Sequence, residues 1–244
     1  MERDGRLLAQ VVAQLFPEHD AQLAIAAGEV LVDGVPVTNP RSRLRAQARV
    51  TMRPVMALRG SAKLRAALDA FDIHVTGRVA LDIGAAAGGF TTVLLEAGAR
   101  LVYAVDAGHG QLLGSLRQDH RVINLESVNI ADLDAGRVPD IVDVVTIDVS
   151  YLSVAAAATQ LNRVALAPDA NMLALVKPMF ELRAATAPSD RASLDAALAA
   201  ASAGVTAAGW EVRSSIDSPV TGSRGAREML LHAQRSAAVA APRA

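Results

Sequence analysis

From residue 79 onward, the sequence alternates short, almost continuously apolar runs with segments of helical character. Five of these runs are VALDIGA (79–85), RLVYAVDA (100–107), VINLES (122–127), VDVVTIDVS (142–150) and NMLALVKP (171–178). A strand that is apolar along its whole length needs cover on both faces, and parallel strands need long crossovers between them, usually helices. The pattern therefore predicts a doubly wound α/β sheet.

Two further strands follow this region, WEVRSSIDSP (210–219) and AREMLLHAQR (226–235). The turn region between them contains proline and glycine and is too short for a helical crossover, so we expect the two strands to pair antiparallel. Seven strands that end in such a pair resemble the sheet of Rossmann-like methyltransferases. We therefore expect a Rossmann-like, seven-stranded α/β domain over residues 56–236, with an antiparallel last strand.

The composition supports a folded chain and narrows its chemistry. Apolar residues make up 52% of the 244 residues and charged residues 20%, which is ample for a packed core. Cysteine is absent, which excludes disulfides, thiolate metal sites and cysteine nucleophiles, and we expect no bound metal. No run has the roughly 20 strongly apolar residues of a membrane span, and the N-terminus has no signal-peptide core. We expect a cytoplasmic protein that contacts no membrane.

Residues 1–55 form a separate unit in this interpretation. Two short helical patterns (5–16 and 20–28) precede EVLVDGVPVTNP (29–40), where Asp33-Gly34 indicates a tight hairpin turn. The order of helix, helix and hairpin resembles the small alpha-L RNA-binding motif and implies an α+β RNA-binding domain. A capping domain that binds nothing is the alternative. Residues 237–244 are expected to be a disordered tail.

The basic tract RSRLRAQAR (41–49) follows the hairpin and has four arginines in nine residues. Because the net charge of the chain is −1, any contact with RNA must come from a local patch such as this one. We take Arg41, Arg43 and Arg45 as candidate RNA-binding residues.

A glycine-rich loop follows the first strand of the large domain, in LDIGAAAGGFT (81–91). Gly84 allows a sharp turn and a close approach to a ligand, and Gly88 and Gly89 open the next helix. The spacing differs from the G-x-G-x-x-G of dinucleotide sites. Asp82, just before the loop, would repel a pyrophosphate but suits the ammonium group of S-adenosylmethionine. A nicotinamide enzyme, or a loop that binds nothing, is the alternative.

Two more residues are candidates for the same cofactor. Asp106 ends the second strand and is placed to accept hydrogen bonds from ribose hydroxyls. Asn129, just after the third strand, would bond the adenine edge or else only form a turn.

Lysine is rare in this chain, because 22 of the 24 basic residues are arginine. Lys177 ends the fifth strand and Asp148 the fourth, while Glu228 begins the antiparallel last strand and Lys63 lies in a helix ahead of the first strand. All four can therefore meet at one edge of the sheet. Gathering two amines and two carboxylates is costly in desolvation, which favours a catalytic interpretation over chance retention. Burial and a second amine both favour the neutral form of a lysine, which can act as a base.

The segments RGSAKL, LDIGAAAGGFT, IDVSY, LVKPMFE and GSRGAREMLL resemble, in order and spacing, the TlyA family within the FtsJ-like ribose 2′-O-methyltransferases, which is also called hemolysin-like. The resemblance covers nearly the whole chain. It implies methyl transfer from S-adenosylmethionine to a cytidine 2′-hydroxyl of ribosomal RNA, free or in ribosomal subunits. The family's Lys-Asp-Lys-Glu tetrad falls on Lys63, Asp148, Lys177 and Glu228.

By this resemblance Lys177 deprotonates the hydroxyl and Asp148 orients the lysine. Lys63 and Glu228 position the ribose and tune the charge, and Arg59, just ahead of Lys63, contacts RNA.

The chain also departs from the family pattern on the side that faces RNA. The loop after Glu181 is short, Leu58 stands where a serine is usual, and Ala226 stands where an asparagine is usual. These departures motivate a second interpretation, a non-catalytic RNA-binding or ribosome-assembly factor. A membrane-lytic protein, suggested by the hemolysin label, is the third.

Overall fold

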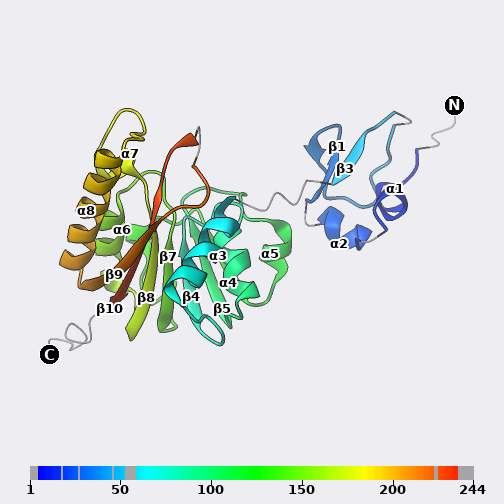
Figure 1. Ribbon diagram of the computed structural model, residues 1–244. Coiled ribbons are helices and arrows are strands. Elements are labelled where there is room, and N and C mark those ends of the chain that lie inside the picture. Colours follow the sequence, from blue (N-terminus) through cyan, green and yellow to red (C-terminus); the bar gives the residue numbers. More distant parts are fainter. Residues whose placement is uncertain are drawn as a thin grey trace. The chain divides into compact units, whose positions relative to one another are not determined.

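The computed structural model describes residues 5–17, 19–26, 28–45, 47–52, 59–222 and 225–235, with only the backbone of Arg59 (Figure 1). The chain divides into two compact units, of which the first comprises Met1–Met56 and Leu112–Asp119 and the second Ala57–Gln111 and His120–Ala244. The boundary predicted near residue 55 and the predicted tail both lie outside the described residues.

The first unit begins with helices α1 (Leu8–Leu15) and α2 (Ala21–Ala26). The hairpin of β1 (Val30–Val32) and β2 (Val35–Pro36) follows, and both of its turn residues have positive φ, 51° at Asp33 and 83° at Gly34. Positive φ at both positions is the geometry that Asp-Gly favours in two-residue hairpins.

A third strand, β3 (Val50–Met52), pairs antiparallel with β1 and was not predicted from the sequence. The core of the unit contains Leu8, Val12, Ile25 and Val30. The short helix α5 (Gly114–Gln118) belongs to the same unit.

The second unit is built on a seven-stranded sheet in the order β6-β5-β4-β7-β8-β10-β9. β10 runs antiparallel to both of its neighbours, and the strands from β6 to β8 pair in parallel. The strands are β4 (Val79–Ile83), β5 (Leu101–Asp106), β6 (Val122–Glu126), β7 (Val142–Ile147), β8 (Leu166–Val176), β9 (Trp210–Asp217) and β10 (Met229–Arg235). The predicted fold class is confirmed.

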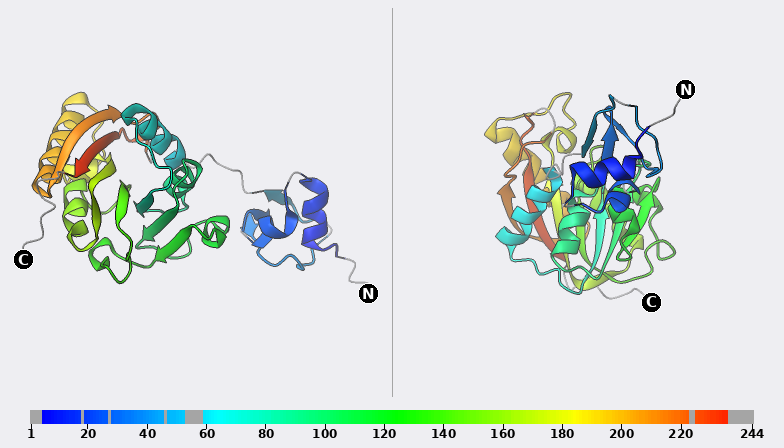
Figure 2. Two further views of the ribbon diagram at one scale, coloured as in Figure 1. Left: turned by 90° about the horizontal axis from the view of Figure 1, so that it is seen from below. Right: turned by 90° about the vertical axis from the view of Figure 1, so that its right-hand side faces the viewer.

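Helices cover both faces of this sheet (Figures 1 and 2). On one face lie α3 (Arg59–Phe71) and α4 (Gly89–Glu96), and on the other α6 (Val154–Thr159) and α8 (Arg191–Ala207). A Cβ on Gly204 of α8 would lie 2.1 Å from the Cβ of Ala155, so small side chains let α6 and α8 pack very closely. The shorter helices are η1 (Ile130–Asp132), η2 (Gln160–Arg163) and α7 (Pro178–Glu181).

The strand order defines where a ligand can bind. β4 is the first strand of the sheet, and the chain builds outward from it on one side through β5 and β6 and on the other through β7 and β8. In open α/β sheets, ligands bind outside the carboxyl ends of the strands at this point of reversal. None of the described helices has the length and apolarity needed to cross a membrane.

Candidate active site

Lys177 lies between the end of β8 and the start of α7, at the carboxyl edge of the sheet. Its Nζ is 2.6 Å from Oδ1 of Asp148, which follows β7, and donates a hydrogen bond of 2.8 Å to Oγ of Ser150. The side chains of Lys177 and Asp148 keep 13% and 22% of their surface exposed. This pair is therefore accessible to a substrate.

The segment after Lys177 is fixed to a neighbouring helix. Pro178 begins α7 at a position where the missing N–H costs nothing. The carboxylate of Glu181 accepts a hydrogen bond of 2.6 Å from the backbone N–H of Val154, the first residue of α6. Burial raises the pKa of Glu181, and this hydrogen bond opposes the rise. The contact ties α7 to α6 and so holds the backbone at Lys177.

Lys63 and Glu228 form the second ion pair of the site. Lys63 projects from α3, Glu228 directly precedes β10, and Nζ lies 2.5 Å from Oε2. Both side chains are only 6% exposed. Gly222 makes room for the carboxylate, because a Cβ there would lie 2.1 Å from Oε1 of Glu228.

Each ion pair contributes one residue, Lys177 or Glu228, to the lining of a pocket of about 630 Å³. Strand pairing sets Met229 opposite Val176, which brings Glu228 beside Lys177. The pocket is lined by Ser150, Lys177, Pro178, Met179, Phe180, Ala185, Thr186, Ala187, Ser189, Gly225, Ala226, Arg227 and Glu228. The structure thus brings together all four residues of the tetrad that the sequence suggested.

The glycine-rich loop between β4 and α4 passes directly beside Asp148. φ is 83° at Gly84, 46° at Ala86 and 96° at Gly88. A Cβ on Gly84 would lie 2.3 Å from the carbonyl oxygen of Asp148, so a side chain there would force the loop away from the end of β7. Gly88 caps α4, and Gly89 is its buried first residue. The loop and the lysine site are therefore neighbours.

Asp82 has different partners from those we expected. Its side chain is fully buried, and it accepts hydrogen bonds from Oγ1 of Thr91 (2.6 Å) on α4 and Oγ1 of Thr146 (2.8 Å) on β7. Burial raises the pKa of Asp82 to about 6, the two threonine hydroxyls oppose the rise, and the charge of Asp148 adds to it. Asp82 therefore joins the loop to α4 and β7 through its two oxygens.

Asp106 and Asn129 both contact backbone close to where they were expected to bind the cofactor. Asp106 is half-buried at the end of β5 and accepts hydrogen bonds from the N–H groups of Ala86 (2.8 Å) and Gly108 (2.7 Å). It therefore links the glycine loop to the loop after β5. Asn129 is exposed, and its side chain accepts a hydrogen bond of 3.1 Å from Ala131 N–H at the start of η1. This hydrogen bond is the contact expected of an asparagine that forms a turn.

The candidate RNA-binding arginines lie on the first unit. Arg41, Arg43 and Arg45, which we call the arginine stripe, are exposed and alternate with the half-buried Ser42 and Leu44. Arg43 also donates a hydrogen bond of 3.1 Å to the carbonyl of Gly5. The side chain of Arg59 lies outside the part of the chain that the structure describes.

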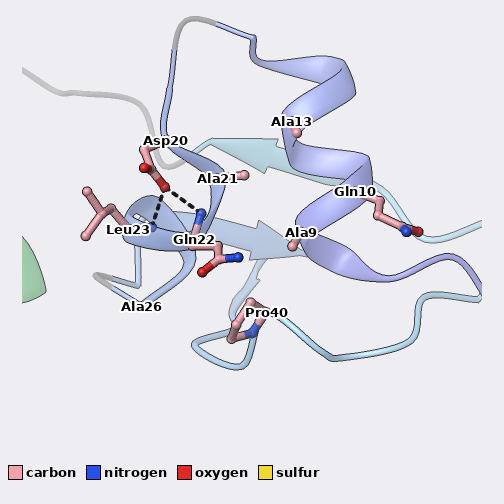
Figure 3. A pocket seen from close by; sticks show the side chains of 9 residues that line it. All are labelled: Ala9, Gln10, Ala13, Asp20, Ala21, Gln22, Leu23, Ala26 and Pro40. Atoms are coloured by element: carbon pink, nitrogen blue, oxygen red, sulfur yellow. Dashed lines mark hydrogen bonds between the residues drawn. The ribbon is translucent and has the colours of Figure 1, made fainter.

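A hollow between α1 and α2 lies in the same unit (Figure 3). Ala9, Ala13 and Ala21 contribute to its wall, and Asp20 accepts backbone hydrogen bonds at the start of α2. None of the nine residues that line it is basic. Phosphate contacts would therefore have to come from the arginine stripe and not from this hollow.

The strand order, the antiparallel β10 and the glycine loop at the reversal point define a Rossmann-like methyltransferase. The model of the FtsJ-like methyltransferase family matches residues 57–235, and the chain belongs to this family. The resemblance seen in the sequence is confirmed, and the methyl donor is S-adenosylmethionine.

Individual relatives agree with this assignment. The chain is 40% identical over 188 residues to the 16S/23S rRNA (cytidine-2′-O)-methyltransferase TlyA of Mycobacterium tuberculosis. The matched region covers 75% of this chain and 70% of that protein. It is 38% identical over 168 residues to Hemolysin A of Brachyspira hyodysenteriae, covering 66% and 68%. The solved structure of a hemolysin-like protein from Streptococcus thermophilus superposes with a TM-score of 0.67 at 28% identity and covers 96% of this chain and 90% of that one.

The residues at the reversal point fit this cofactor. Gly84 lets the loop lie directly against the end of β7, at the carboxyl edge of the sheet where ligands bind in such folds. The half-buried carboxylate of Asp106 offers the acceptors that ribose hydroxyls need.

Proposed function

We propose that this chain transfers the methyl group of S-adenosylmethionine to the 2′-hydroxyl of a cytidine in ribosomal RNA, with Lys177 as the general base. The observation that carries the proposal is the Lys177 amine, held 2.6 Å from Asp148 at the wall of a pocket that Glu228 also lines. The name of the mycobacterial relative supports ribosomal RNA and cytidine as substrate.

Bound at the glycine loop, the cofactor supplies a methyl group that is electrophilic because it is attached to a positively charged sulfur. The chain's own contribution is to hold the acceptor and to remove its proton. Lys177 Nζ, when neutral, accepts the proton of the ribose hydroxyl. Asp148 orients the amine and stabilises the ammonium that forms.

Lys63 and Glu228 act on the other side of the pocket. Because this ion pair is almost fully buried, its geometry is fixed before substrate arrives. Glu228 lines the pocket and can accept a hydrogen bond from a ribose hydroxyl, while Lys63 neutralises its charge. The pair thereby positions the sugar without adding net charge next to Lys177.

Contact with RNA outside the pocket is assigned to the first unit. The three exposed side chains of the arginine stripe would neutralise phosphates, which is the main source of non-specific affinity for nucleic acid.

The test is incorporation of labelled methyl groups into ribosomal RNA and into purified ribosomal subunits. Lys177→Met removes the base and should slow transfer by about 10²–10⁴-fold, the usual contribution of a general base. Arg163→Met removes an exposed positive charge on η2 and serves as the matched control. Equal rates for wild type and Lys177→Met would refute the role of Lys177. RNA binding by a wild-type chain that methylates no ribosomal RNA would support the non-catalytic alternative instead.

A further inference from the structure

Ser150 is a contact of the Lys177 amine that lies outside the tetrad. Its Oγ accepts a hydrogen bond of 2.8 Å from Nζ, and it lies two residues after Asp148, whose carboxylate is the other partner of the amine. Ser150 is an exposed residue. A hydrogen bond at an exposed position contributes little to stability, so the need to satisfy a buried group does not explain this contact.

A neutral lysine amine must have a fixed rotation if its lone pair is to face a substrate. Such an amine has two N–H bonds and one lone pair, and it can rotate about the Cε–Nζ bond. The ion pair with Asp148 alone would leave this rotation, and so the lone pair, without a fixed direction. The hydrogen bond to Ser150 directs one N–H bond, and together with the nearby carboxylate it sets the direction of the lone pair.

The Lys177 amine borders a pocket that a substrate can enter. Lys177 and Ser150 both line the pocket of about 630 Å³ that also contains Glu228. A hydroxyl in this pocket can therefore reach the amine.

We propose that Ser150 is a positioning residue that acts together with Asp148 to fix the rotation of the Lys177 amine, so that its lone pair faces the ribose hydroxyl. The inference rests on the proposed function, because it assigns Ser150 a part in the same proton transfer.

The kinetic test compares three variants of the full chain. In Ser150→Ala, kcat for methylation of ribosomal RNA should fall about tenfold, because the amine loses the hydrogen bond that fixes its rotation, while KM stays within about twofold. Ser150→Thr keeps the hydroxyl at an exposed position and should restore kcat. Ser153→Ala is the control, because Ser153 caps α6 in the same loop without contacting the amine. Wild-type kcat in Ser150→Ala, or an equal loss in Ser153→Ala, would overturn the inference.

A second measurement depends on no RNA substrate. Because the chain contains only two lysines, ¹³C-lysine labelling gives two Cε signals in an NMR spectrum, and Lys177→Arg identifies which one is Lys177. Loss of the Ser150 hydroxyl changes the surroundings of the Lys177 amine, so in Ser150→Ala the chemical shift of the Lys177 signal should change while the Lys63 signal stays in place. An unmoved Lys177 signal overturns the role of Ser150 alone. Absence of methyl transfer by the wild type overturns the proposed function.

Discussion

The buried carboxylate of Asp82 gives a quantitative test of the site. Its side chain is fully buried, and burial raises its pKa from an ordinary value of 3.8 to about 6 against the effect of two threonine hydrogen bonds. Asp82→Asn replaces the carboxyl group by a neutral amide of the same shape. The amide oxygen can still accept a hydrogen bond from one threonine, and the amide N–H can donate to the hydroxyl oxygen of the other.

The sign of the change in stability with pH follows from the protonation state of Asp82 that the folded protein prefers. A raised pKa means that folding favours the protonated acid, so this stabilisation is complete below the unfolded pKa of 3.8 and is lost as the pH rises through about 6. A difference of about 2 pKa units corresponds to about 3 kcal/mol. Relative to Asp82→Asn, the wild type should therefore lose about 3 kcal/mol of unfolding free energy between about pH 4 and pH 8.

The assay is urea unfolding of both proteins across this pH range, followed by the fluorescence of Trp210, the one tryptophan, which is 2% exposed. Groups that do not interact with Asp82 contribute equally to both proteins and cancel in the difference. Asp69→Asn, at an exposed position of α3, makes the same chemical change away from the core and gives the background trend. A difference between wild type and Asp82→Asn that stays flat with pH would refute the reasoning.

Three further predictions concern the ion pair, the loop and the first unit. Lys63→Met leaves Glu228 buried without a partner and should cost about 3–5 kcal/mol of unfolding free energy, whereas Lys63→Met/Glu228→Met should be nearly neutral in stability yet inactive. Urea unfolding measures the stability and methyl transfer the activity. An active double variant would contradict the role of the pair. Gly84→Ala should cost at least about 1–2 kcal/mol for the left-handed backbone alone and weaken cofactor binding in calorimetry, because the loop must move away from Asp148. Replacing all three residues of the arginine stripe by alanine should lower the slope of log Kd against log salt for single-stranded RNA by about 2, and an unchanged slope would favour a capping role for the unit.

The main elements of the fold could be predicted because each carries a local signal. The five apolar runs match β4 to β8, and Asp33-Gly34 sits in the hairpin turn with the predicted geometry. The start of β8 was missed because Pro168 and Asp169 interrupt its apolar pattern, and the pairing with β7 shifts register in this region. β3 has only three residues, and its pairing with β1 is a long-range contact without a local signal.

The sequence predicted which edge of the sheet carries the site, but it did not predict all the contacts that the site residues make. Strand direction alone placed Lys177, Asp148 and Glu228 at one edge, since that edge holds the carboxyl ends of the parallel strands and the start of the antiparallel one. The partners of Asp82 depend on which side chains of α4 and β7 face β4, and the glycine pattern contains no such information. The hydrogen bond between Lys177 and Ser150 could have been suggested from the sequence, because Ser150 lies only two residues after Asp148.

The two ion pairs of the site differ in how far their side chains are exposed. Each lysine of the site is paired with its own carboxylate. Four charged groups can therefore lie close together without leaving an unpaired charge when no substrate is bound. The Lys63–Glu228 pair is 6% exposed on both sides, which makes it a fixed part of the wall. Lys177 and Asp148 are more exposed, at 13% and 22%, and only this lysine has a hydroxyl as second partner among the described contacts. A base must exchange its proton with substrate and solvent in every turnover, so the greater exposure of Lys177 supports the proposal that it, and not Lys63, is the base.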